Sequence, residues 1–193
     1  MPKAKKIPVE DCTDIGWKEH RKKLRDLGPV DALVLHQAGF KRTDDSPHDY
    51  RKVKAHYVIT RSGRILMYHP ANQLLWSSNG FNKRSVAVEF IGNMPSTQGK
   101  WYKPEKFGSD QLADAQIEAG RALAEHLMGD LFITHIFAHR QASASRGNCP
   151  GPDIWSTVGQ WAVEELGLKD GGANYTTGDG KAIPDDWRTW YVY

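Results

Sequence analysis

Residues 132–155 read FITHIFAHRQASASRGNCPGPDIW, and this stretch combines an apolar run, a polar segment and a rigid turn. Residues 132–138 are largely apolar, which predicts a buried strand with His139 directly at its end. Ten residues later, Cys149 stands in the sequence NCPGP, whose prolines and glycine predict a tight turn that leads into a helix. The stretch therefore places a histidine and a cysteine on either side of a strand-to-helix connection.

A second histidine has the same position relative to a strand. Residues 32–35 (ALVL) form a short, wholly apolar run, which is typical of a buried strand, and His36 follows it directly. Polar side chains at strand ends project into the crevice where α/β sheets bind ligands. Two imidazoles and a thiolate that converge there would form an open zinc site, in which a bound water has a pKa of about 7. The same spacing is compatible with two polar strand ends and a small buried cysteine, because it lacks the specificity of a paired CxxC motif.

Glu89 and His56 are further candidates for chemistry. Glu89 is a carboxylate within the apolar strand predicted at residues 86–91, and it could act as a general base if it faces the crevice. Burial there would raise its pKa and help it hold a proton for a leaving amine. It could equally lie on the strand surface and pair with Arg84 or Lys83. His56 begins a strand and could stabilise an oxyanion, although a lone histidine in a strand is more often structural.

Hydrophobic periodicity predicts the remaining elements of the chain. They are a helix at residues 17–27 with Trp17, His20, Leu24 and Leu27 on one face, a hairpin of strands at 56–60 and 64–68, a helix that Ser109 caps with an apolar face from Ala113 to Leu127, and a last helix from Pro152 to Leu166. Residues 41–54 and 93–107 are polar or rich in glycine and proline, which predicts loops. Strands interleaved with helices and one hairpin predict an α/β domain with a central mixed sheet flanked by helices.

Length and composition fit one soluble domain. The chain has 193 residues, of which 39% are hydrophobic and 25% are charged, so a normal core can form under a polar surface. We expect a basic arm at residues 1–16, a catalytic domain at 17–167, and a C-terminal tail at 168–193 that packs on this domain. No apolar run approaches the roughly 18 residues of a membrane span, and no apolar run follows the basic N-terminus. We therefore expect cytoplasmic synthesis without a signal peptide, and no membrane partner.

Net charge and cysteine content exclude few classes of binding partner. The net charge of +3 would suit an anionic polymer such as nucleic acid or cell wall, but most proteins with this balance bind neither, and we expect no nucleic-acid partner. Cys12 and Cys149 would stay reduced in a cytoplasmic chain, so one of them could be a ligand or a nucleophile. The motifs HExxH, GxGxxG and GxSxG and the Walker loop do not occur.

The order of the motifs is more informative than any one of them. The chain reads VLHQAG around His36, AHYVITRSGRI from residue 55, SVAVEFIGN around Glu89, and AHRQASASRGNCPGPDIW from residue 138. This order resembles the zinc-dependent N-acetylmuramoyl-L-alanine amidases of the amidase-2 type. Their superfamily includes phage amidase endolysins, bacterial cell-wall recycling amidases and peptidoglycan recognition proteins. The resemblance covers about residues 30–166, and HYVITRSGRI and CPGPDIW are its most specific segments.

The resemblance implies a zinc cleft on one side of the sheet. The ligands of a single zinc ion would be His36, His139 and Cys149. The third ligand is aspartate in the recycling amidases and cysteine in phage endolysins and catalytic recognition proteins, so Cys149 favours the latter two groups. Glu89 matches the catalytic glutamate of the recycling branch, and His56 falls where other branches have tyrosine.

Two segments depart from the pattern of the family. A lysine or threonine often stands two residues before the third ligand, where this chain has Gly147, and the adjacent Arg146 could supply the positive charge instead. The family often has Trp-His-Ala-Gly on the cleft wall, where this chain has Trp76-Ser77-Ser78-Asn79. We expect Trp76, Asn79 and Trp101 to contact the substrate.

The resemblance predicts a peptidoglycan hydrolase that cleaves the amide between N-acetylmuramic acid and the L-alanine of the stem peptide. A phage or prophage endolysin fits best, and it would act on the wall as a monomer after holin-type release. The alternatives are a recognition module that binds muropeptides without cleaving them, and a cytoplasmic recycling amidase. A cysteine hydrolase with Cys149 as nucleophile and His139 as base is disfavoured by Pro150 and would leave His36 unused.

Overall fold

A six-stranded mixed sheet forms the centre of the computed structural model, which describes residues 7–40, 46–95 and 110–189. β4 and β5 pair antiparallel as the predicted hairpin, and all other neighbours in this sheet pair parallel, which confirms the expected fold class. The strand order is β1 (Val9–Asp11), β5 (Ile65–Met67), β4 (Tyr57–Ile59), β7 (Ser85–Phe90), β3 (Ala32–Gln37) and β8 (His135–Ala138).

The register of the central strands brings the candidate residues to one edge of the sheet. His36 of β3 pairs with Glu89 of β7, and Leu35 pairs with Ala138, the last residue of β8. Parallel strands have their carboxyl ends at the same edge, so His36, Glu89 and His139 come together there. Every residue of β3 is buried, as expected for a parallel strand that is covered on both faces.

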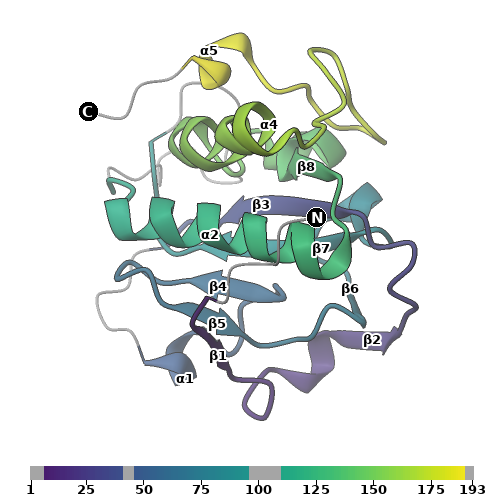
Figure 1. The fold of residues 1–193 in the computed structure, drawn as a ribbon, viewed down its shortest axis with the longest axis vertical. Coiled ribbons are helices and arrows are strands. Elements are labelled where there is room, and N and C mark those ends of the chain that lie inside the picture. The colour runs from purple at the N-terminus through teal and green to yellow at the C-terminus, as the bar shows by residue number, and fades with distance from the viewer. Residues whose placement is uncertain (1–6, 41–45, 96–109, 190–193) are drawn as a thin grey trace.

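Helices cover one face of this sheet (Figure 1). α2 (Asp114–Leu131) packs against β4 and against α4 (Trp161–Leu166). A Cβ atom at Gly120 would lie 2.7 Å from the ring of Phe90, so α2 approaches β7 at a distance that only glycine permits. Leu33 and Leu35 belong to the core cluster beneath the helices, whereas Ala32 and Val34 belong to a second cluster on the opposite face.

The last predicted helix is present as a continuous helical run. It consists of α3 (Pro152–Ile154), a π-helical segment at Trp155–Gln160, and α4. α2 has Ala113 as its N-cap, and Ser109, the expected cap, lies outside the described residues. The predicted loop at residues 41–54 contains the short α1 (Pro47–Tyr50), and most of the predicted loop at 93–107 is not described. Within the described residues, no helix is long and apolar enough to cross a membrane.

The helix predicted at residues 17–27 is wrong. The segment contains a short 3-10 helix (Lys18–His20) and then β2 (Arg21–Leu24), which pairs antiparallel with β6 (Gln73–Leu75). Leu24 and Leu27 are 70% and 42% exposed, so they form no buried helix face. Arg25 donates hydrogen bonds instead to the carbonyls of Ala71, Asn82 and Ser85. These tertiary contacts hold the chain extended, and they are absent from the local sequence pattern.

The sheet begins earlier in the chain than expected. Residues 9–11 lie within the segment expected to form a loose arm, but they form β1 and pair with β5. Glu10 and Arg64 form a bidentate ion pair with distances of 2.6 and 2.7 Å, and Cys12 is buried. This part of the predicted arm is therefore an edge strand of the sheet.

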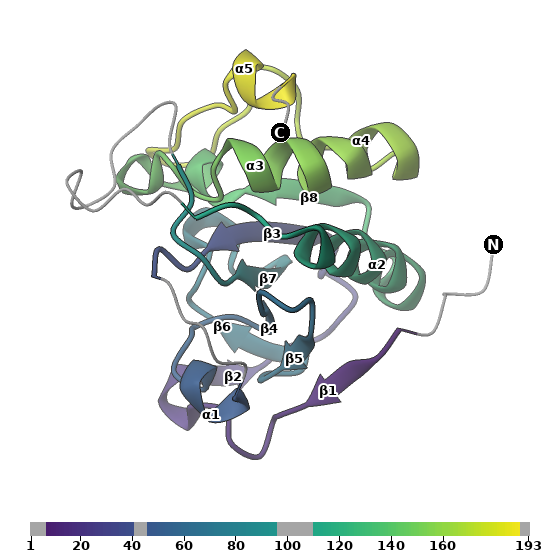
Figure 2. The same cartoon turned by 90° about the vertical axis from the view of Figure 1, so that its left-hand side faces the viewer.

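The C-terminal segment from Leu168 to Thr189 packs onto the same end of the sheet as β8 (Figure 2). Lys169 forms a β-bridge with His135 of β8, and α5 (Asp185–Arg188) follows at the end of the segment. Ile183 and Trp187 belong to the main core cluster together with residues of the sheet and of α2. The segment is therefore built into the core.

Candidate metal centre and its cleft

Three candidate ligands converge at the carboxyl edge of the sheet. His36 is near the end of β3, His139 follows β8, and Cys149 lies in the turn before α3. Their ligand atoms all lie within 4.8 Å of one another, and the two imidazole centroids are 4.3 Å apart. All three side chains are buried. Two imidazoles and one thiol form a donor set that suits zinc, with a coordination position left open.

The protonation states of these groups also suit a metal. Burial lowers the pKa of His36, as do the nearby His139 and Arg146. Burial and the charge of Arg146 lower the pKa of His139 to about 3, so both imidazoles are neutral at pH 7. Burial raises the pKa of the Cys149 thiol, and the charge of Glu89 raises it further. A hydrogen bond from the main-chain N–H of Gln37 and the positive charge of Arg146 oppose this shift. The thiol would therefore lose its proton when a metal binds.

The segment that precedes β7 supplies polar contacts to both imidazoles. Nε2 of His36 lies 3.1 Å from Oγ of Ser78, and Nε2 of His139 forms a hydrogen bond of 2.7 Å with Oδ1 of Asn79. Asn79 has a φ of 51°, in the left-handed region that asparagine tolerates better than most residues. These contacts fix the orientation of the rings, as outer contacts do in metal sites.

Gln37 holds the turn that carries Cys149. Its Nε2 donates to the carbonyl of Asn148 at 3.0 Å, and its Oε1 accepts from the main-chain N–H of Met94 at 2.9 Å. Gly151 has a φ of 95°, and a Cβ atom there would lie 2.8 Å from Nε2 of Gln37. The residue directly after one candidate ligand thus positions the loop of another.

The ligands open onto a cavity of about 610 Å³. It lies where strand ends meet the segments around residues 52–54 and 76–79, a position typical of ligand sites in α/β folds. Besides the three ligands, the predicted site residues that line it are Glu89, Arg146, Trp76 and Asn79.

Glu89 faces this cavity from β7 and is only partly buried. Burial raises its pKa to about 8, and the charge of Arg146 opposes the shift. Within the described residues, no hydrogen bond or ion pair involves the side chain of Glu89, and Arg84 forms its ion pair with Asp31 instead. The carboxyl group is therefore available to a ligand, and a bound cation would favour its ionised form.

Arg146 places a positive charge beside the candidate ligands. It ends a 3-10 helix (Ala144–Arg146), lines the cavity, and influences the pKa of Glu89 and of all three candidate ligands. Gly147, at the position where the family often has lysine or threonine, contributes no side chain. The cation beside the candidate ligands comes from the neighbouring Arg146, and Lys52 and Lys54 line the same cavity.

The structure does not bring His56 to this centre. Its Nδ1 accepts a hydrogen bond from the main-chain N–H of Ala87, and its Nε2 donates to the carbonyl of Gln73. Burial and the nearby Arg25 lower its pKa to about 3, and the residues that line the cavity do not include it. Both ring nitrogens are used to join main-chain segments.

The remaining predicted contacts lie at the rim. Trp76 is 64% exposed beside the cavity, and Nζ of Lys22 lies 5.1 Å from its ring centroid. Trp101 lies outside the described residues. Four further residues of the site were not predicted: Ser78, Gln37, Lys52 and Lys54. Only Gln37 could have been found from the sequence, because it directly follows His36 at the end of a predicted strand and therefore lies at the same edge of the sheet.

A model of the family described as N-acetylmuramoyl-L-alanine amidase (Amidase_2) matches residues 26–152. The chain belongs to this family. The matched residues include the three candidate ligands and Glu89. A comparison with curated protein sequences returns no match.

Solved structures share the fold of this Amidase_2 protein. The endolysin amidase LysCS from Clostridium intestinale URNW is 18% identical, with a TM-score of 0.61, and the match covers 86% of this chain and 99% of that one. Drosophila PGRP-LB is 15% identical, with a TM-score of 0.60 and coverages of 86% and 98%. Human PGRP-IβC, solved in complex with glycosamyl muramyl pentapeptide, is 14% identical, with a TM-score of 0.60 and coverages of 79% and 95%.

Proposed function

We propose that the protein is a zinc-dependent peptidoglycan hydrolase. It would cleave the amide bond between the lactyl group of N-acetylmuramic acid and the L-alanine of the stem peptide. The observation that carries this proposal is the convergence of His36, His139 and Cys149 with Glu89 at one cavity. The family of the chain supports the substrate class.

The donor set fits one zinc ion per chain. His36 and His139 are neutral and need no deprotonation, and Cys149 supplies the single anionic ligand. Zinc held by these residues would polarise the scissile carbonyl and lower the pKa of a water that it binds.

Glu89 would serve as the proton carrier of the reaction. Its carboxylate takes a proton from the attacking water as the C–O bond to the lactyl carbonyl forms. It then gives this proton to the amine of L-alanine as the C–N bond breaks, so the carboxylate is regenerated. Burial raises the pKa of Glu89 to about 8 in the metal-free cleft, and this preference for the protonated carboxyl supports the second transfer.

Arg146 would stabilise the oxyanion that develops on the carbonyl oxygen. It is the candidate that lines the cavity as a cation beside the ligands, whereas His56 has no free ring nitrogen. Loss of one such donor typically costs about 3–4 kcal/mol of transition-state stabilisation. Trp76, Asn79 and Trp101 would contact the sugar or the stem peptide.

The biological setting that we propose is a phage or prophage endolysin that acts on the cell wall after release. Cysteine as third ligand supports it, as does the likeness in fold to endolysin amidases. A recognition module that binds peptidoglycan without cleavage is the second candidate, because Gly147 leaves one position of the cleft without a side chain.

The test measures the zinc content of the purified protein and the release of free stem peptides from purified sacculi. Wild type and Cys149→Ala are compared, with Cys12→Ala as matched control, because Cys12 is also buried but lies in a separate cluster. We expect one zinc per chain and peptide release in wild type and Cys12→Ala, and neither in Cys149→Ala. Zinc without peptide release in wild type would favour the recognition module, and absence of zinc would overturn the metal site.

A further inference from the structure

We propose that Arg140 is a positioning residue for the metal centre, and that the C-terminal segment Leu168–Thr189 holds it in place through Trp187. This inference rests on the proposed function, because it concerns the loop that carries His139 and Cys149. The Amidase_2 match ends at residue 152, so the segment lies beyond the part of the chain that the family describes.

Arg140 connects the two candidate ligands of this loop. It directly follows His139, and its main-chain N–H donates to the carbonyl of Cys149 at 2.9 Å. Its Nη1 donates to the carbonyl of Gly147 at 2.7 Å. A single buried residue therefore closes the loop from residue 139 to residue 149 at two points, one at Cys149 itself and one two residues before it.

The indole of Trp187 is the surface against which the Arg140 guanidinium lies. The guanidinium carbon is 4.6 Å from the ring centroid, and Trp187 is fully buried. Nε of Arg140 is buried without a hydrogen-bond partner among the described residues, so the guanidinium is held there by the Gly147 carbonyl and by its contact with the ring. Removal from water strengthens the attraction between a cation and the face of an aromatic ring.

The main chain of the C-terminal segment lies directly on residues 140 and 141. The N–H of Lys181 donates to the carbonyl of Arg140, and the N–H of Thr177 donates to the carbonyl of Gln141, both at 2.8 Å. A Cβ atom at Gly180 would clash with the carbonyl oxygen of Gln141. The close approach leaves no room for the loop to shift outward.

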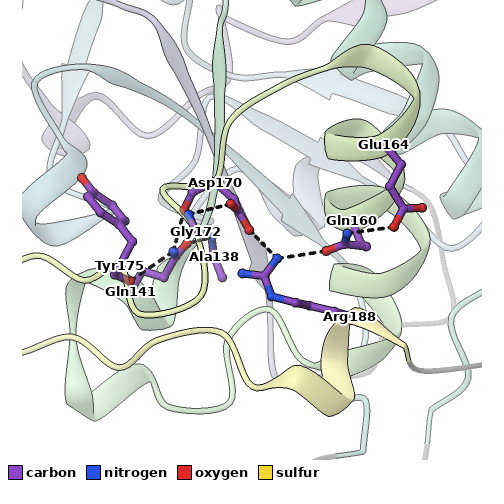
Figure 3. Close-up of polar contacts among 8 residues, drawn as sticks. All are labelled: Ala138, Gln141, Gln160, Glu164, Asp170, Gly172, Tyr175 and Arg188. Carbon is purple, nitrogen blue, oxygen red and sulfur yellow. Dashed lines mark hydrogen bonds and ion pairs between the residues drawn. The ribbon is translucent and has the colours of Figure 1, made fainter.

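Gln141 adds a second connection, which Figure 3 shows. Its Oε1 accepts from the N–H of Ala138 at 2.9 Å, on the other side of His139. Its Nε2 donates to the carbonyls of Asp170 and Tyr175 at 3.0 and 3.3 Å. His139 is therefore flanked on both sides by residues that the C-terminal segment holds.

A chain of polar contacts fixes α5, which carries Trp187 (Figure 3). Nη1 of Arg188 lies 2.6 Å from Oδ2 of Asp170 and donates to Oε1 of Gln160 at 3.1 Å. Gln160 in turn donates to Glu164 of α4 at 2.8 Å. Trp187 is thereby connected to the helical run that follows Cys149.

Loss of these contacts should lower the affinity of the site for zinc. Zinc requires its ligands within a few tenths of an ångström of their bonding distances, and outer contacts that orient ligands typically change metal affinity by about 10–100-fold when removed. Loss of the Arg140 guanidinium frees the carbonyl of Gly147 and loosens the Cys149 turn. We therefore expect weaker binding without loss of any ligand.

The experiment compares Arg140→Met with Arg121→Met in the full-length protein. Arg121 is a matched control, because its guanidinium lies 5.0 Å from the ring of Trp161 and its Nε donates to the carbonyl of Thr157, away from the cleft. Zinc affinity is measured by competition with a chromophoric chelator, and Co²⁺ substitution reports the thiolate-to-metal charge-transfer band. Thermal unfolding of the metal-free proteins gives the stability of each variant.

We expect Arg140→Met to bind zinc about 10–100-fold more weakly and to show a shifted or weakened cobalt–thiolate band. Arg121→Met keeps the affinity and the band of wild type, even where its melting temperature falls equally. Arg140→Lys, which keeps a cation over Trp187 with fewer donors, restores part of the affinity.

Wild-type affinity and cobalt spectrum in a folded Arg140→Met would overturn the positioning role. Equal losses of affinity in Arg140→Met and Arg121→Met would also overturn it, because they would reflect general destabilisation. A wild-type protein that binds no zinc removes the metal site and this inference together. Tight zinc binding without peptide release, by contrast, overturns the hydrolase while the effect of Arg140 on affinity remains.

Discussion

Two pairs of buried histidines differ in what surrounds them. His36 and His139 in the cleft, and His56 and His69 near β6, all have pKa values lowered by burial. The cleft pair lies beside the Cys149 thiol and faces the cavity. The ring nitrogens of His56 bind main-chain groups, and Nδ1 of His69 accepts from Nε of Arg21 at 3.3 Å.

The difference shows that burial and a neutral imidazole do not by themselves make a metal site. Next to the cleft pair lie a thiol and a carboxyl group, both of which can become anionic. The second pair has Arg25 and Arg21 as its nearest charges, and these would repel a cation. Access to the cavity and a neighbouring group that can become anionic separate the two regions. A free ring nitrogen does not separate them, because Nε2 of His69 has no hydrogen-bond partner among the described residues.

The largest expected effect is the loss of zinc when a histidine of the cleft is replaced by alanine, and the same replacement in the second pair serves as the comparison. His36→Ala should lose the zinc and reduce peptide release by more than the roughly 100-fold that outer contacts produce. His56→Ala should keep one zinc per chain but lose stability, because it leaves the N–H of Ala87 and the carbonyl of Gln73 buried and unpaired at about 1–3 kcal/mol each. Zinc content and urea unfolding of the metal-free proteins measure the two effects. A folded His56→Ala protein without zinc would contradict this comparison.

Glu89 offers the next test, because it separates chemistry from metal binding within the cleft. Glu89→Gln should retain zinc and reduce peptide release by about 10²–10⁴-fold, the usual contribution of a general acid–base group. The pKa of about 8 is above that of an unfolded glutamate, so this group stabilises the metal-free fold at low pH and loses that contribution as pH rises toward 8. Metal-free Glu89→Gln should therefore be less sensitive to pH between about 5 and 8. Peptide release within tenfold of wild type would place the base elsewhere.

The sequence predicted those parts of the site that depend on local pattern. His36 and His139 each follow an apolar strand, and parallel strands bring such residues to one edge. Cys149 lies in a turn that the sequence NCPGP predicts through its prolines and glycine. The family resemblance then assigned roles that spacing alone left open.

The parts that could not be predicted depend on contacts between distant segments. The helix expected at 17–27 is replaced by β2, because Arg25 finds three carbonyls from residues 71–85. His56 has the same local pattern as a site residue, yet Ala87 and Gln73 take both of its nitrogens. The support of Arg140 by Trp187 joins residues 47 positions apart, and no local period encodes it.

The burial of the second histidine pair should make the free energy of unfolding fall at acidic pH. The pKa of His69 is lowered to about 4, first by burial and then by Arg21 and His20, whereas in the unfolded chain it is near 6.5. Between these values the unfolded chain binds the extra proton, so stability falls as pH falls, by up to about 1.4 kcal/mol per pH unit for this histidine. Metal-free His69→Gln should therefore lose less stability than wild type between pH 6.5 and 4 in urea unfolding. An unchanged pH dependence would show that His69 is not buried neutral.

The smallest effect is expected at the rim, where Trp76 extends the cleft without taking part in its chemistry. Its ring is 64% exposed and its removal breaks no buried contact, so Trp76→Ala should change stability by less than about 0.5 kcal/mol. If the ring packs on a sugar or the stem peptide, its loss should cost about 0.5–1.5 kcal/mol of binding, which is roughly 2- to 12-fold in KM with kcat unchanged. Leu24→Ala is the matched control, because Leu24 is 70% exposed on β2 but does not line the cavity. Kinetics on soluble muropeptides distinguish the two, and equal KM values for both variants would remove Trp76 from the substrate surface.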